Sequence, residues 1–265
     1  MQLRVGAATD IGRVRDLNED AYRLRADQGL FVVCDGMGGG PAGEVASELA
    51  AASILDHLDR SAKPAPAVIP DAGGYLPQTS RLAEAVRRSN QFVYSQALRN
   101  PDQTDMGTTV VTAWVTRHIA SVAHVGDSRA YLWHQGRLEA LTRDHSLVEA
   151  QVRAGLVNRE DALRSGQRNV LVRVLGRQPN IDVDLAEVPV QPGDYLVLCS
   201  DGLTRMVSDQ MLAETITELR DPQRICDHLI GAANRNGGAD NITVVVVQVA
   251  LTWWRRLSNR WSGQV

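Results

Sequence analysis

The sequence has few of the residues that define several common protein classes. Three cysteines among 265 residues, with no CxxC pair, are too few for a disulfide framework or a zinc site of that kind. Six histidines and a formal net charge of −3 leave no clustered basic excess for binding nucleic acid. No uncharged apolar run reaches the ~20 residues of a transmembrane segment, and the first residues lack a signal-peptide stretch. These absences predict a protein of the reducing cytoplasm with no nucleic-acid partner.

What the chain does have is the pattern of a globular α+β protein, with 44% hydrophobic and 22% charged residues. Runs rich in β-branched residues predict strands at 3–9, 29–34, 108–116, 119–125, 130–134, 181–190, 195–199 and 242–249. Apolar residues at helical spacing predict helices at 44–59, 80–98, 207–219 and 221–235. Ser80 and Asp221 are the expected N-caps of the second and fourth helices. This order favours a single domain with a two-layer antiparallel β core covered by helix pairs, in which 61–80 is a surface loop.

Acidic and amide side chains gather where predicted strands begin or end. The four clusters are Asn18-Glu19-Asp20, Asp35-Gly36, Asp201-Gly202 and Asp240-Asn241. Each Asp-Gly pair alone is a common tight turn, which is the plain alternative for either one. Oxygen donors without a His or Cys cluster favour Mg²⁺ or Mn²⁺. Two such ions ~3.5–4 Å apart can activate a bridging water for attack on phosphorus, so a two-metal centre is the sharper hypothesis.

Seven motifs follow one another along nearly the whole chain. They are DIGRVRDLNEDA (10–21), VVCDGMGGGPAGEVAS (32–47), MGTTVV (106–111), VAHVGDSRAYL (122–132), LTRDHS (141–146), LCSDGL (198–203) and GGADNITVVVV (237–247). In content and order they resemble the metal-dependent serine/threonine protein phosphatases of type 2C, the PPM family. The resemblance implies a four-layer αββα sandwich of two antiparallel sheets, each covered by a helix pair. Residues 1–250 would form the phosphatase domain, with a substrate-selecting flap at about 145–168.

The resemblance also implies a set of metal ligands. Asp35 is expected to bridge two Mn²⁺ or Mg²⁺ ions, one of which the carbonyl of Gly36 also binds, while Asp201 and Asp240 bind the other ion. Bacterial members often place a third, looser metal near the aspartate that corresponds to Asp127. The alternative for Asp127 is a simple turn, in which 127–129 would join the strands at 119–125 and 130–134 as a hairpin.

Four further residues match catalytic positions of the family. Glu19 and Asp20 match positions that hold metal-bound waters. Arg15 matches the phosphate-binding arginine, and its guanidinium fork suits two phosphate oxygens. The alternative for Arg15 is a surface ion pair with an aspartate of the same segment. Asn241 is expected to orient the Asp240 carboxylate.

The chain departs from many eukaryotic members at Met37, because a histidine often proposed as the general acid stands at that position in them. Leaving-group protonation would then fall to a metal-bound water or to a histidine from elsewhere. His124 and His145 are the histidines considered for this role, and a structural role is favoured for both. Met37 is interpreted as a mark of the bacterial type and not of an inactive protein.

The C-terminal segment, residues 251–265, is rich in Trp and Arg. A tail docked on its own domain or a disordered end is favoured, and binding to a partner or weak contact with an anionic membrane surface is the alternative. Cys34 and Cys199 precede predicted metal-binding aspartates. Oxidation there could disturb the centre, but buried structural thiols are favoured.

These observations predict a monomeric phosphoserine/phosphothreonine phosphatase of bacterial type. It would hydrolyse phosphate monoesters of phosphorylated proteins by direct attack of a metal-bridging hydroxide and so reverse a Ser/Thr kinase. One rival is a non-catalytic binding module of the same fold. The presence of all the expected metal-binding aspartates disfavours it. The other is an unrelated two-metal nuclease or phosphodiesterase, which the missing basic surface disfavours.

Overall fold

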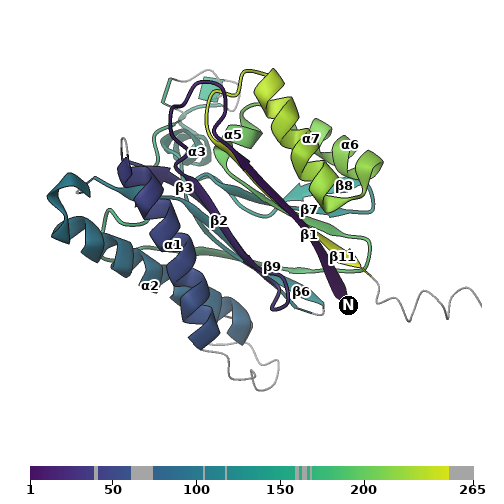
Figure 1. Cartoon of the computed structure of the whole chain (residues 1–265), viewed down its shortest axis with the longest axis horizontal. Helices are drawn as coiled ribbons and strands as arrows, with labels where there is room; N and C mark the ends of the chain where they lie inside the picture. The colour runs from purple at the N-terminus through teal and green to yellow at the C-terminus, as the bar shows by residue number, and fades with distance from the viewer. Residues whose placement is uncertain are drawn as a thin grey trace, which may run out of the picture.

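Two antiparallel β-sheets form the centre of the computed structural model (Figure 1), which describes residues 1–250 except 39–40, 61–73, 104, 117, 159–160, 163–165 and 168. The first sheet has the order β1 (Gln2–Asp10), β11 (Ile242–Ala250), β10 (Tyr195–Cys199), β7 (Arg129–His134) and β8 (Arg137–Ala140). The second has the order β2 (Asp20–Arg25), β3 (Leu30–Met37), β5 (Val110–Val115), β6 (Ile119–Val125) and β9 (Asp184–Pro189), with β4 (Gly107–Thr108) also paired to β3.

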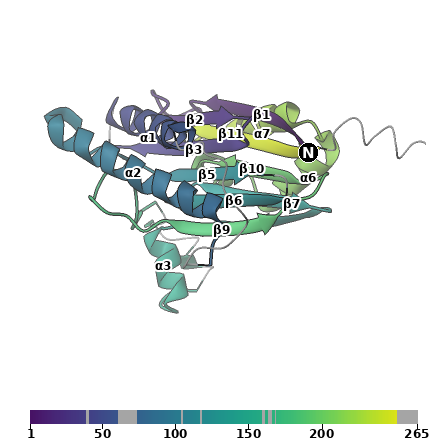
Figure 2. The ribbon, with the colours of Figure 1, turned by 90° about the horizontal axis from the view of Figure 1, so that it is seen from below.

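A helix pair covers the outer face of each sheet (Figures 1 and 2). The helices α1 (Pro41–Arg60) and α2 (Pro77–Arg99) pack on the sheet that contains β3, and α6 (Asp209–Leu219) and α7 (Pro222–Arg235) pack on the sheet that contains β11. Short helices in the described parts of the connections are η1 (Pro101–Gln103), α3 (Leu147–Arg153) and α5 (Asp201–Thr204). This arrangement confirms the predicted αββα sandwich.

The apolar run of β11 explains why the layers assemble this way. Alternate residues of a strand point to opposite faces of its sheet. Val244 and Val246 lie in the core under α7, whereas Val245 and Val247 lie in the core between the two sheets. Because both faces of this strand are covered, a continuous run of valines is stabilising, and no polar alternation is needed.

The structure corrects several details of the sequence prediction, and the edge strand β8 was not predicted. Ser80 is not the N-cap of α2, because the helix begins earlier, with Leu76 at the N-cap and Pro77 in the first turn, where its fixed φ and missing N–H fit. The strand β2 was not predicted, because its Arg23 and Arg25 interrupt the apolar pattern at the edge of the sheet. The Asp221 N-cap is confirmed, since its side chain accepts a hydrogen bond from the backbone N–H of Arg224.

Several predicted features fall wholly or partly outside the described residues. The segment 251–265 lies outside them, and so do most of the predicted loop at 61–80 and parts of the predicted flap at 145–168, which contains α3. Among the helices that the structure describes, none combines the length and the apolar character needed to cross a membrane.

Candidate metal centre and active site

Strand pairing places two carboxylates directly opposite each other. In the antiparallel pair of β2 and β3, Asp20 is the partner of Asp35. Like charges at directly opposite positions are destabilising, and Asp20 is buried while Asp35 is partly buried. The register of these two strands therefore concentrates negative charge at one end of the sheet.

The backbone packs closely at both Asp-Gly pairs. A Cβ atom on Gly36 would lie 2.1 Å from the carbonyl oxygen of Gly43 in α1, and one on Gly202 would lie 2.0 Å from the carbonyl oxygen of Asn241. Only glycine fits such approaches. The two Asp-Gly pairs are thus places where separate segments pack against each other, which a simple turn would not require.

The loop between β1 and β2 carries Arg15 and Glu19 and is held by one amide side chain. The Nδ2 of Asn241 donates to the carbonyl oxygens of Ile11 and Leu17, both at 2.9 Å, and its Oδ1 accepts from the backbone N–H of Glu19 at 2.8 Å. Asn241 was expected to orient the Asp240 carboxylate. Its backbone N–H does donate to Asp240 Oδ1 at 3.0 Å, but its side chain positions the loop.

The connection that carries Asp127 crosses from one sheet to the other. It follows β6 of the second sheet and precedes β7 of the first, so the hairpin alternative for 127–129 is wrong. This crossing brings Asp127, which is almost fully buried, next to Asp201 at the start of α5. Ser128 is fixed below it by a 2.7 Å hydrogen bond between its Oγ and that of Thr109.

These segments surround one cavity of about 630 Å³. Its acidic lining residues are Glu19, Asp35, Asp127, Asp201 and Asp240, and its basic ones are Arg15, Arg173, Arg177 and Arg205. Gly36, Met37 and Asn241 also line it, and the described residues that line it include no histidine. The predicted site residues are therefore brought together, except that Asp20 lies just beneath the lining, where it accepts a 2.7 Å hydrogen bond from the Oγ of Ser200.

Burial and mutual repulsion raise the pKa values of Asp20, Asp35 and Asp201. Burial raises the pKa of Asp20 to about 7, and nearby Asp240 and Glu19 add to this effect. The pKa of Asp35 is well above its usual range because of burial and of the charges of Asp20, Asp201, Asp127 and Asp240. Burial and the charge of Asp127 do the same for Asp201. The clustered carboxylates therefore carry more negative charge than the neighbouring side chains neutralise.

Hard divalent cations bind oxygen ligands, and carboxylate oxygens that have no hydrogen-bond partner in the protein are suited to this role. Among the described side chains, Glu19 Oε1, Asp20 Oδ1 and Asp201 Oδ1 are buried without a hydrogen-bond partner. All acidic donors of the cavity are carboxylates, which suit Mg²⁺ or Mn²⁺ better than zinc. The residues present therefore fit two or more such cations.

Arg205 is a site residue that sequence reasoning missed. It forms an ion pair with Asp201 and lies near Asp240 and Asp127. Its position four residues after Asp201, one helical turn along the chain, is the signal that could have revealed it. Arg15 pairs with Asp240, a partner more than 200 residues away, and not with an aspartate of its own segment.

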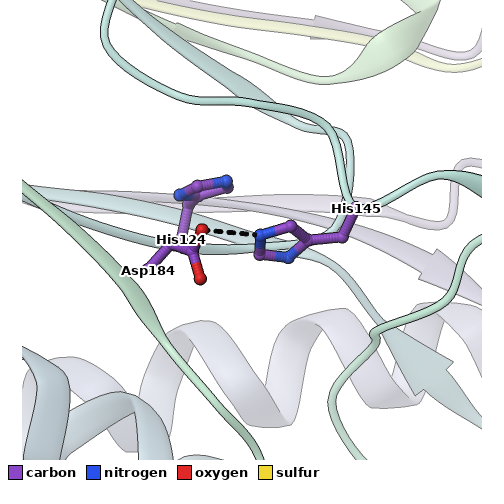
Figure 3. Close-up of side chains that lie close together, drawn as sticks. All are labelled: His124, His145 and Asp184. Carbon is purple, nitrogen blue, oxygen red and sulfur yellow. Dashed lines mark ion pairs between the residues drawn. The ribbon is translucent and has the colours of Figure 1, made fainter. Parts of the chain in front are cut away.

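A second polar cluster lies outside the cavity and joins His124, His145 and Asp184 (Figure 3). The imidazole rings stack with centroids 4.5 Å apart, and Nε2 of His145 lies 3.2 Å from Oδ2 of Asp184. The backbone N–H of Gly126 donates to Nδ1 of His145, so the ring proton of neutral His145 is on Nε2, facing the carboxylate. A cation at that nitrogen would have to displace the proton, and Arg173 already pairs with Asp184 at 2.6 Å. The charge of Asp184 is therefore paired within the protein, although His145 Nε2 forms no hydrogen bond of its own.

Comparisons with known proteins agree with this geometry. The sequence model of a family described as "Protein phosphatase 2C" matches residues 12–229. The chain is 38% identical over 247 residues to "Serine/threonine phosphatase stp" of Listeria monocytogenes, covering 92% of this chain and 95% of that protein. The crystal structure of the Mycobacterium tuberculosis serine/threonine phosphatase PstP/Ppp superposes with a TM-score of 0.83 at 35% identity, covering 95% of this chain and 100% of that one.

A further solved structure bears on the metal. The catalytic domain of a serine/threonine protein phosphatase PstP, in complex with two manganese ions, matches with a TM-score of 0.80 and 34% identity, covering 94% of this chain and 99% of that one. Fold, acidic cavity and relatives together define a metal-dependent phosphatase. The chain belongs to the protein phosphatase 2C family, as a serine/threonine phosphatase of the type found in bacteria.

Proposed function

We propose that the acidic cavity binds two divalent cations, Mn²⁺ or Mg²⁺, and that the chain then hydrolyses phosphoserine and phosphothreonine monoesters in proteins. The observation that carries the proposal is the convergence of carboxylates from distant segments on one cavity, with buried oxygens left unpaired. Asp35 and the Gly36 carbonyl would hold one ion, and Asp35, Asp201 and Asp240 the other. A third ion would bind between Asp127 and Asp201.

Bound cations of this kind supply Lewis acidity and lower the pKa of a coordinated water. The chain's own residues provide the rest of the mechanism. Glu19 and Asp20 would accept hydrogen bonds from waters at the floor of the cavity. Ser200 holds Oδ2 of Asp20, which leaves its unpaired Oδ1 for this role. Asn241 keeps the loop that carries Arg15 and Glu19 in register with the cavity.

Arg15 is the residue that would bind the phosphate. Its guanidinium contacts both carboxylate oxygens of Asp240 at 2.9 Å, and half of its side chain is exposed. An exposed arginine can exchange a carboxylate partner for phosphate oxygens with the same planar fork. With no histidine among the described lining residues, the proton for the leaving alkoxide would come from solvent in the cavity, and neither His124 nor His145 would supply it.

The proposal extends to the cellular setting. The enzyme would act as a monomer in the cytoplasm, on proteins phosphorylated by a Ser/Thr kinase and on the kinase itself, with residues 1–250 as the catalytic domain and about 145–168 as its flap. Three buried free cysteines are compatible with a reducing compartment.

One assay tests the proposed activity against its rivals. A phosphothreonine peptide and a phosphodiester are each incubated with the full chain and Mn²⁺, with and without chelator. Chelator-sensitive release of phosphate from the peptide alone is expected. Turnover that resists the chelator, or a preference for the diester, would contradict the proposal, and a chain that binds the peptide without turnover would be a binding module.

A matched pair of variants locates the activity. Asp201→Asn removes a proposed ligand and should lower turnover at least about 100-fold, since even residues that only support metal ligands contribute 10- to 100-fold. Asp194→Asn changes an equally buried carboxylate that is already paired with His134 and the Gln191 N–H. Near-normal turnover of Asp201→Asn would show that the site is misplaced.

A further inference from the structure

Arg205 has an unusual position, because its guanidinium lies among three of the proposed metal ligands. It pairs with Asp201, its Nη1 lies 3.5 Å from Oδ2 of Asp240, and its Nη2 lies 3.8 Å from Oδ2 of Asp127. Three-quarters of its side chain is buried. A largely buried cation beside buried carboxylates interacts with them far more strongly than a surface pair does.

Arg205 and Arg15 approach the acidic group in different ways. Arg15 is half exposed and pairs with Asp240, as expected of a residue that exchanges its partner for a phosphate. Arg205 projects from α5, one turn after Asp201, and spans Asp127 and Asp201 together. These two aspartates form the edge of the cavity where an additional cation would bind, so Arg205 and that cation require the same carboxylate oxygens.

A second cavity lies beside the Arg205 side chain. This cavity of about 410 Å³ adjoins the first and shares Asp127, Asp201 and Arg205 with it. Glu149 and Val152, both in α3 of the predicted flap, also line this second cavity. A guanidinium that leaves Asp127 and Asp201 would enter this second cavity, whose lining includes Glu149.

We propose that Arg205 is a built-in counter-ion of the metal centre. It holds Asp127 and Asp201 together when no cation is bound, and it opposes cation binding at their edge, because a cation there must displace it against charge repulsion. This inference rests on the proposed function, since it assumes that the cavity binds Mn²⁺ or Mg²⁺. Its consequence is that the residue at this position sets how many cations the cavity holds at a given concentration.

The test measures Mn²⁺ binding and thermal unfolding of the full chain, neither of which requires turnover. Arg205→Gln removes the charge and keeps a side chain of similar length. Compared with the wild type, it should bind Mn²⁺ about tenfold more tightly at the weakest site in a calorimetric titration. It should also unfold at a lower temperature in chelator, and gain more from added Mn²⁺. A merely structural arginine would lower the unfolding temperature without tightening Mn²⁺ binding.

Two further variants make the outcome decisive. Arg224→Gln removes the same charge from an exposed position on α7 and should leave both measurements unchanged. Arg205→Lys keeps the charge without the planar fork and should lie between the wild type and Arg205→Gln. If Arg205→Gln binds Mn²⁺ as the wild type does, or more weakly, the counter-ion role is overturned. If Arg205→Gln does not fold, Mn²⁺ binding by Arg205→Lys that is weaker than that of the wild type overturns it instead. A wild type that binds no Mn²⁺ refutes the proposed metal centre itself, which distinguishes the two failures.

Discussion

The acidic cavity and the His124–His145–Asp184 cluster are two buried polar regions at the same end of the β sandwich, and their chemistry is opposite. In the cavity, carboxylates face one another and several of their oxygens have no partner among the described residues. In the histidine cluster, ring nitrogens face a backbone N–H, a backbone carbonyl and a carboxylate. Three residues near one another with metal-ligand chemistry are therefore not enough to indicate a metal site.

The charges of the facing groups separate the two regions, because both contain a buried atom without a hydrogen-bond partner, His145 Nε2 among them. The Nε2 of His124 lies 2.8 Å from the carbonyl oxygen of Arg143, and both nitrogens of His145 have neighbours of complementary kind. Burial lowers the pKa of His124, and it lowers the pKa of His145 to about 4. The histidine cluster carries one carboxylate, which Arg173 pairs, whereas Arg15 and Arg205 pair with only part of the larger group of carboxylates in the acidic cavity.

The largest expected effect comes from Asp35→Asn. This variant removes the proposed bridging ligand, so phosphopeptide turnover should fall at least about 100-fold. Stabilisation by Mn²⁺, which amounts to about 2.7 kcal/mol at 100 times Kd for a single site, should also disappear. In chelator the variant should be at least as stable as the wild type, because a buried and repelled carboxylate is gone.

Asp194→Asn is the control for that experiment, because Asp194 is buried with hydrogen-bond partners outside the cavity. It should destabilise the chain with and without Mn²⁺ alike. If Asp35→Asn lowers stability in chelator as much as Asp194→Asn does, the acidic cavity is satisfied by the protein alone and the contrast between the two regions disappears.

The second prediction concerns His145→Gln. The substitution takes a partner from the buried N–H of Gly126 and from Asp184, so the free energy of unfolding should fall by about 1–3 kcal/mol. Because no cation is involved, the loss should be equal in Mn²⁺ and in chelator. Denaturant titrations under both conditions measure it, and a loss that appears only in Mn²⁺ would assign the cluster to metal binding.

The two regions should also respond to pH with opposite signs in the metal-free protein. The folded pKa of Asp20, about 7, lies above its ordinary value of 3.8, so its contribution to stability is present at low pH and is lost as the pH rises toward 7. The folded pKa of His145, about 4, lies below its ordinary 6.5, so its contribution is present above pH 6.5 and is lost toward pH 4.

Urea titrations of Asp20→Asn, His145→Gln and the wild type at pH 5 and pH 7 separate these contributions. Relative to the wild type, Asp20→Asn should gain stability as the pH rises, and His145→Gln should gain stability as the pH falls. Parallel pH dependences of the two variants would mean that burial has not shifted the two groups in opposite directions.

The sequence predicted the fold well where patterns were strong. All eight predicted strands and four predicted helices are present, because continuous apolar runs and helical periodicity reflect burial directly. The edge strand β2 was missed because its charged residues interrupt the apolar pattern, and its pairing with β3 cannot be read from the local sequence. The start of α2 was misplaced because proline in the first turn competed with a serine cap.

The site was predictable as a set of residues but not as a geometry. Local motifs identified Asp35, Asp201 and Asp240, yet only strand register shows that Asp20 opposes Asp35. The crossing of the chain between sheets at Asp127, and the placement of Arg205 among the acidic residues, depend on tertiary packing.

The smallest expected effect on stability tests whether burial, and not charge alone, separates the two regions. Arg15 pairs with Asp240, but its side chain is 50% exposed, and exposed ion pairs contribute about 0–1 kcal/mol. Arg15→Lys should therefore change the free energy of unfolding in chelator by less than about 1 kcal/mol. Its KM for a phosphopeptide should rise about tenfold, because an ammonium cannot reproduce the two parallel hydrogen bonds of the guanidinium. A large loss of stability with an unchanged KM would make Arg15 a structural partner of Asp240, and phosphate binding would then have to be assigned to another residue of the cavity.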